Sequence, residues 1–97
     1  MFDAKVYLDS LEKPTFIALD GTKYEGVLVS FNVALKYTSQ MNEPESDQQV
    51  FDAVAGFMRE LQLPAEAIEQ ALQLPLVGLL EMVTDFLGCL SGRRKTS

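Results

Sequence analysis

The sequence predicts an α+β fold in which an N-terminal β-hairpin packs on a small cluster of about four helices. Two observations carry this prediction. Asp20-Gly21 lies between two β-prone runs, which is a strong hairpin signal. After residue 30, apolar side chains recur at the three- and four-residue spacing of amphipathic helices. The 97 residues suffice for one globular domain, which we assign to residues 1–92, followed by a short basic disordered tail at 93–97.

Residues 2–13 are compatible with two structures. Apolar residues at positions 2, 4, 6 and 8 alternate with more polar ones, and this pattern favours a β-strand. The residues that follow tolerate a helix, and Pro14 would end a short N-terminal helix. The sequence alone does not decide between the two.

The hairpin is predicted between Phe16 and Val29. A type I′ turn would join its strands and would require positive φ at both Asp20 and Gly21. Gly26, inside the second run, indicates a β-bulge. Because an isolated hairpin is only marginally stable in water, we expect this one to lie on the helices that follow.

The first two helices are predicted from their caps and apolar faces. The first runs from a Ser30 cap to about Met41, and the second starts at a capping box formed by Ser46 and Gln49. The expected inner face of the first is Phe31, Ala34, Leu35, Thr38 and Met41. That of the second is Val50, Val54, Phe57, Met58 and Leu61.

A third, short helix is predicted over Ala65–Leu74, with Ile68, Ala71 and Leu72 facing inward. Pro64 and Pro75 each lie where a helix begins, a position at which the missing N–H of proline costs nothing.

The fourth helix, Pro75–Leu90, has apolar residues on most of its sides, whereas an ordinary surface helix buries one stripe. Either it forms the centre of the monomer core or part of it meets another chain. We predict a homo-oligomer whose interface includes part of this helix. The candidate interface residues are Leu76, Leu79, Leu80, Val83, Phe86 and Leu87. Glu81 and Asp85 are expected at its solvated edge, or opposite a positive group on a partner chain.

We expect no catalytic, cofactor or metal site. The sequence contains no histidine, so Cys89 has no imidazole to activate it as a nucleophile. One cysteine and no histidine also leave a zinc site without a ligand set.

Charge argues against nucleic-acid binding by the folded part. Residues 1–92 contain 14 acidic and five basic residues, a net charge of −9, which a phosphate backbone would repel. The Pro75–Leu90 run is too short and too acidic for a membrane span, and the N-terminus lacks the layout of a signal peptide. We therefore expect a cytoplasmic protein that does not enter the membrane.

The order of these features resembles a known family. Leu11-Glu12-Lys13-Pro14 ends a short first segment, Asp20-Gly21-Thr22-Lys23-Tyr24 forms the hairpin turn, and Val29-Ser30-Phe31 leads into a helix. An acidic spacer, amphipathic helices and a basic end follow. This layout resembles the tail assembly chaperones of long-tailed bacteriophages.

The resemblance implies a non-enzymatic protein of the host cytoplasm. It would bind the long helical tape measure protein and keep it soluble while the tail tube assembles. Members of this family often also have a longer form, which is made by ribosomal frameshifting. The alternative from another class is a small acidic adaptor or regulatory protein that dimerises through the Pro75–Leu90 helix and binds one protein partner.

Overall fold

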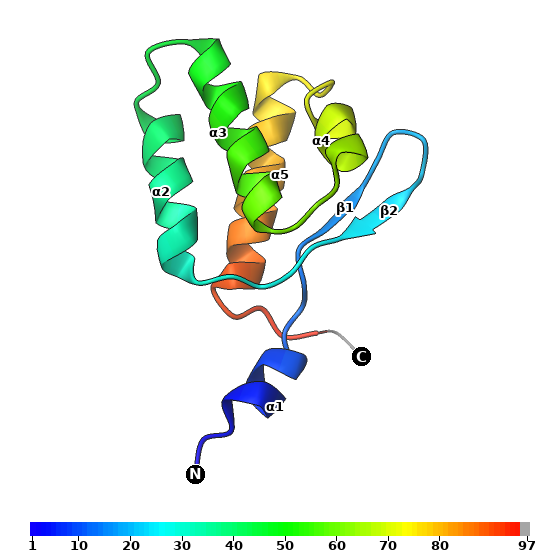
Figure 1. Ribbon diagram of the computed structural model, residues 1–97, viewed down its shortest axis with the longest axis vertical. Helices are drawn as coiled ribbons and strands as arrows, with labels where there is room; N and C mark the ends of the chain where they lie inside the picture. Colours follow the sequence, from blue (N-terminus) through cyan, green and yellow to red (C-terminus); the bar gives the residue numbers. More distant parts are fainter. Residues whose placement is uncertain (96–97) are drawn as a thin grey trace.

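The computed structural model describes residues 1–95, and its order of elements confirms the α+β class (Figure 1). The strands are β1 (Thr15–Ile17) and β2 (Lys23–Glu25). The helices are α1 (Ala4–Asp9), α2 (Phe31–Asn42), α3 (Asp47–Glu60), α4 (Ala65–Ala71) and α5 (Leu76–Leu90). Helices α2, α3 and α5 lie alongside one another, α4 and the hairpin lie on one side of them, and α1 projects beyond the body.

The N-terminal segment is a helix rather than a strand. The Asp3 side chain caps α1 by accepting a hydrogen bond from the backbone N–H of Val6 at 3.1 Å. The Ser10 hydroxyl donates to the carbonyl of Tyr7 at the other end. The alternation of apolar and polar residues favoured a strand, but β1 pairs only with β2 within residues 1–95. A helix satisfies its own backbone hydrogen bonds and needs no partner strand.

The hairpin is confirmed, but its turn is not of type I′. Phe16 pairs with Tyr24 across the antiparallel strands, whereas positive φ occurs at Gly21 (88°) and not at Asp20. The Gly21 N–H donates to the Ala18 carbonyl at 2.9 Å, and the Ala18 N–H donates to the Thr22 carbonyl at 2.8 Å. This pattern is a three-residue loop closed by a glycine bulge, which needs only one residue with positive φ.

Gly26 brings the hairpin against the end of α3. The N–H of Val27 donates to the carbonyl of Leu61 at 2.9 Å, and a Cβ at Gly26 would lie 2.8 Å from that same oxygen. The glycine that we interpreted as a bulge therefore permits a close approach between two backbone segments. This contact holds the hairpin on the helices. The hairpin needs such support because an isolated hairpin is only marginally stable in water.

The caps of α2 and α3 lie where the sequence predicts them. The Ser30 hydroxyl accepts from the N–H of Asn32, and the Ser46 hydroxyl accepts from the N–H of Gln49 at 3.3 Å. The Gln49 side chain reaches back to the N–H of Glu45 at 2.6 Å rather than to Ser46, so the second arm of the capping box is shifted by one residue.

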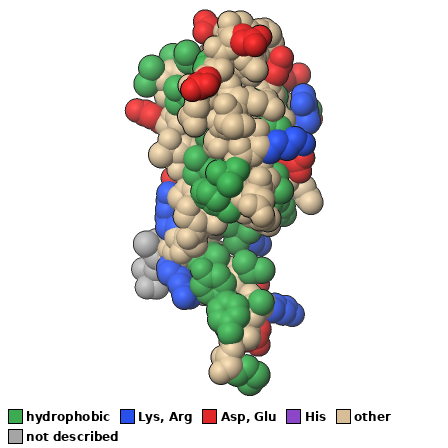
Figure 2. Space-filling view, turned by 90° about the vertical axis from the view of Figure 1, so that its left-hand side faces the viewer, with side chains coloured by type: hydrophobic (Ala, Val, Ile, Leu, Met, Phe, Trp, Pro, Cys, Tyr) green, Lys and Arg blue, Asp and Glu red, His purple; other side chains and the backbone are tan. Residues whose placement is uncertain are grey.

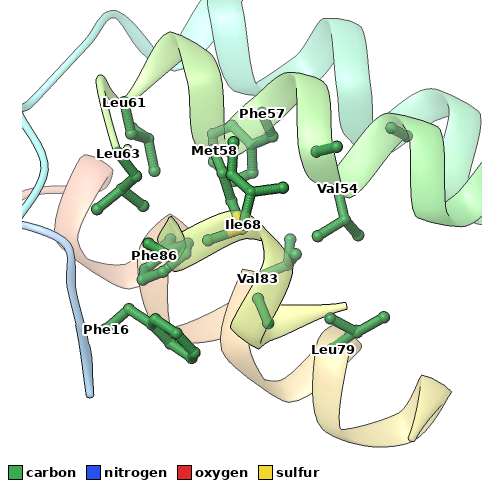
Figure 3. Close-up of a cluster of buried hydrophobic side chains, with 14 of the residues drawn as sticks. Phe16, Val54, Phe57, Met58, Leu61, Leu63, Ile68, Leu79, Val83 and Phe86 are labelled. Carbon is green, nitrogen blue, oxygen red and sulfur yellow. The ribbon is translucent and has the colours of Figure 1, made fainter. Parts of the chain in front are cut away.

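The core forms where α3 meets α4, α5 and the hairpin (Figure 3). The predicted face of α3 is buried throughout: Val50, Val54, Phe57, Met58 and Leu61. The rings of Phe57 and Phe86 meet edge to face, with centroids 6.3 Å apart. No charged side chain is buried among residues 1–95, so the core is held by apolar packing.

Helix α4 is shorter than predicted and ends at Ala71. Ala67, Ile68 and Ala71 face inward, but Leu72, which the sequence placed on the same face, is exposed. Pro75 explains the early end, because a proline disfavours helical backbone in the residue before it and cannot continue a helix.

The C-terminal residues return to the N-terminal segment. Gly92, with φ 104°, ends α5 in a turn in which the N–H of Arg93 donates to the carbonyl of Gly88. The N–H of Glu12 then donates to the Arg93 carbonyl at 2.7 Å, and the N–H of Lys95 donates to the Ser10 carbonyl at 3.1 Å. We call residues 10–12 and 93–95 the terminal clasp.

Residues 93–95, which we predicted to begin a disordered tail, form part of the terminal clasp instead. The Arg93 guanidinium lies 2.7 Å from the Asp85 carboxylate and 3.8 Å from that of Glu12, and the hydrogen bond to Asp85 raises the pKa of Arg93. A prediction based on apolar content missed these polar contacts. Residues 96 and 97 of the predicted tail lie outside the described residues.

Candidate protein-interaction groove

The free cysteine of the chain lies inside the fold. The burial of Cys89 raises the pKa of its thiol. No three His, Cys, Asp or Glu side chains in this part of the chain lie close enough to hold a metal ion. None of the helices over residues 1–95 has the length and apolar character needed to cross a bilayer.

A hollow lined largely by apolar residues lies between α2 and α5, which run antiparallel (Figure 1). It has a volume of about 510 Å³, within the range of protein binding pockets. We call it the α2–α5 groove. It is lined by Phe31, Leu35, Thr38, Met41 and Asn42 of α2 and by Leu80, Val83, Thr84 and Leu87 of α5.

The α2–α5 groove exists because only part of the predicted inner face of α2 is buried. Ala34 and Met41 are buried as predicted, but Phe31 and Leu35 are 42% and 51% exposed. The expectation that Phe31, Leu35 and Thr38 face the core is therefore wrong. These three side chains point towards α5 and form one wall of the groove.

The hydroxyls of the two threonines that line the groove already have hydrogen-bond partners. The Thr84 hydroxyl donates to the carbonyl of Leu80 at 2.9 Å, and the Thr38 hydroxyl donates to the carbonyl of Leu35 at 3.3 Å. Each hydroxyl is thus bonded to the backbone of its own helix. The other lining side chains are mostly apolar, apart from the Asn42 amide.

The structure divides the predicted interface residues into two groups. Leu79 and Phe86 are buried in the core of the monomer, and Leu76 is half-buried at the start of α5. Leu80 and Leu87 line the groove, with Val83 buried at its floor. Asp85, expected at the solvated edge, is exposed and pairs with Arg93 of its own chain.

The α2 wall of the groove was missed by the sequence analysis. Its signal was present, because α2 and α5 each carry a wider apolar surface than one neighbouring helix can cover. The sequence analysis identified this surplus for α5 but placed Phe31, Leu35 and Thr38 of α2 on the face towards the core.

An acidic loop continues from one end of the groove. Asn42, at the end of α2, is followed by Glu43, Glu45 and Asp47, and all three carboxylates are exposed. Figure 2 shows acidic side chains gathered at this end of the molecule. The groove is thus an apolar surface with a negative border at this one end, which favours an apolar ligand with positive charge at the corresponding end.

Comparison of the chain with protein families, curated proteins and solved structures finds no match.

Proposed function

We propose that this protein is a non-enzymatic phage tail assembly chaperone that binds the tape measure protein and keeps it soluble during tail assembly. The observation that carries the proposal is the apolar α2–α5 groove, open to solvent on an acidic chain. The client would insert the apolar face of a helix between α2 and α5, in the helix-in-groove mode of peptide recognition.

The apolar side chains of the groove are suited to binding a client helix. Phe31, Leu35, Leu80 and Leu87 offer apolar side chains on two antiparallel helices, so a client helix would contact both walls. Contacts of this kind accept many sequences, because they depend on apolar area more than on the pairing of particular polar groups. A chaperone for a long helical client requires such tolerance.

The charge of the chain supports the same function. Residues 1–92 carry a net charge of −9, and a highly charged partner opposes aggregation of the complex through mutual repulsion. The negative border at Glu43, Glu45 and Asp47 would also attract a client segment with basic flanks. The tape measure protein as the client rests on the resemblance of the sequence layout to tail assembly chaperones.

Co-expression with a candidate tape measure protein tests the proposal. We expect the wild-type chain to keep the tape measure protein in the soluble fraction and Leu80→Asp to lose this effect, since a carboxylate would enter the groove without a partner. Val77→Asp is the matched control, because Val77 lies on the same helix, is 68% exposed and does not line the groove.

Three results would contradict the proposal. The first is a tape measure protein that is equally insoluble with and without the wild-type chain, and the second is an equal effect of Leu80→Asp and Val77→Asp when both variants fold. A gene neighbourhood without tail proteins would also contradict it and would favour the small adaptor protein instead.

A further inference from the structure

The two ends of the described chain are joined outside the main core. Within residues 1–95, the main cluster of apolar side chains contains no residue before Phe16 and none after Leu90. No residue of α1 is buried, and this helix projects beyond the body (Figure 1). Leu11 and Cys89 are 4% and 1% exposed, but neither belongs to the main cluster. The terminal clasp therefore accompanies a smaller buried region of its own.

Exposed contacts close the terminal clasp. Two backbone hydrogen bonds, of 2.7 and 3.1 Å, join residues 10–12 to residues 93–95. Arg93 adds ion pairs to Asp85 and Glu12, whose side chains are 52% and 43% exposed. Exposed ion pairs contribute little to stability, because water screens the charges. The terminal clasp is therefore held more weakly than the core, and regions with few buried contacts open first.

The body of the protein holds the chain from Pro14 onwards. The Pro14 side chain is fully buried, and its carbonyl accepts a hydrogen bond from the N–H of Gly26 at 2.7 Å. Lys13, the residue before it, is exposed. At the other end of the chain, Leu90 still packs against the main core. Residues 1–13 and 93–95 can thus leave the body without disturbing the main core or the backbone pairing of the hairpin.

Cys89 lies in the last turn of α5, directly before the chain turns back into the terminal clasp. The N–H of Gly92 donates to the Cys89 carbonyl at 3.1 Å. Burial raises the pKa of the Cys89 thiol, and the charges of Arg93, Asp85 and Glu12 also act on it. The groups that close the terminal clasp are thus neighbours of the one thiol in the sequence.

We infer that the terminal clasp opens while the body of the protein stays folded. On opening, residues 93–95 separate from residues 10–12, α1 is released from the body, and the Cys89 thiol becomes accessible to water. The hairpin and helices α2–α5 keep their packing, so the α2–α5 groove remains formed. Neither the opening nor its test involves a client of the groove, so the failure of this inference and the failure of the proposed function are distinguishable.

Thiol labelling of the full-length chain measures the opening. N-ethylmaleimide reacts with an accessible thiolate, and the single cysteine makes the signal specific. The labelling rate divided by that of the urea-unfolded chain gives the open fraction. We expect this fraction to exceed the unfolded fraction measured by circular dichroism by at least about tenfold. Its urea dependence should be less than about half of that of global unfolding, because opening exposes less surface.

Arg93→Gln should loosen the terminal clasp. The exchange removes two exposed ion pairs, so Cys89 labelling should become about two- to thirtyfold faster while the thermal midpoint of the body changes little. Arg59→Gln is the matched control. Arg59 is exposed in the last turn of α3 and takes no part in the clasp, so labelling of this variant should match wild type.

A disulfide across the terminal clasp should hold it shut. Leu11 and Arg94 face each other in an antiparallel bridge. The hydrogen bonds on either side make them a non-hydrogen-bonded pair, whose usual Cα separation of about 4.5 Å suits a disulfide. In the oxidised Leu11→Cys/Arg94→Cys variant, Cys89 should label at least about tenfold more slowly than in Leu11→Ser/Arg94→Ser, the matched pair that cannot form the bond. Mass spectrometry verifies the new bond and locates the label, and circular dichroism verifies that each variant is folded.

Three results would overturn the inference. The first is wild-type Cys89 that labels only at the rate of global unfolding, with its full urea dependence. The second is an oxidised variant that labels as fast as its serine control. The third is Arg93→Gln that speeds labelling only as far as it destabilises the body. Where the cysteine pair does not form its bond, the wild-type and Arg93→Gln measurements decide alone.

Discussion

At the scale of single residues, the two turns that end α3 and α5 are the same motif built with different residues. Each has a residue with positive φ directly after the helix cap, which is Gln62 (62°) after α3 and Gly92 (104°) after α5. In both, the following N–H donates to a carbonyl five residues earlier, as in Leu63 to Met58. Glycine adopts this backbone without cost, whereas a residue with a Cβ is strained there by roughly 1–2 kcal/mol.

Gln62→Gly should therefore raise the free energy of unfolding by about 0.5–1 kcal/mol, after the greater freedom of glycine in the unfolded chain is taken into account. Urea denaturation measures it. Gln70→Gly is the matched control, because the same exchange inside α4 should lower stability by a similar amount. A loss of stability in both variants would show that the positive φ of Gln62 carries no strain.

At the scale of elements, α5 serves the core on one side and the groove on the other. Leu79 is fully buried and Leu80 is 39% exposed, although the two are adjacent in sequence. Neighbouring residues on a helix point about 100° apart, so one apolar run covers two surfaces. This explains why α5 is apolar on most sides without being the central helix of the core.

Truncation of these two leucines should separate the two surfaces. Leu79→Ala leaves a cavity in the core and should lower the free energy of unfolding by about 2–5 kcal/mol. Leu80→Ala removes a side chain that solvent already reaches, so its cost should be roughly 1 kcal/mol or less. Chemical denaturation of the two variants provides the comparison, and equal losses would contradict the placement of Leu80 in an open groove.

Elements with local signals were predictable from the sequence, and contacts between distant segments were not. The Asp20-Gly21 hairpin, the Ser46 cap and the α3 face all follow from residues within one or two turns of each other. The groove wall on α2 depends on which residues of α2 reach α3, and periodicity does not contain that information. The terminal clasp joins residues more than 80 positions apart through backbone hydrogen bonds, which side-chain patterns do not reveal.

At the scale of the whole molecule, the ends of the longest axis, which measures 47 Å, are built from different parts of the chain. One end holds the acidic loop between α2 and α3, and the other holds α1 and the basic residues of the terminal clasp (Figures 1 and 2). The apolar groove lies on the body between these ends.

The most direct test of the central claim, that the α2–α5 groove binds the tape measure protein, is site-specific photo-crosslinking during co-expression. Leu80 is replaced by the photoreactive residue benzoylphenylalanine in one variant and Val77 in another, because both lie on α5 and only Leu80 lines the groove. We expect a crosslink to the tape measure protein from position 80 and little or none from position 77. Crosslinks of equal yield from both positions, or from position 77 alone, would contradict the assignment of the groove as the client-binding surface.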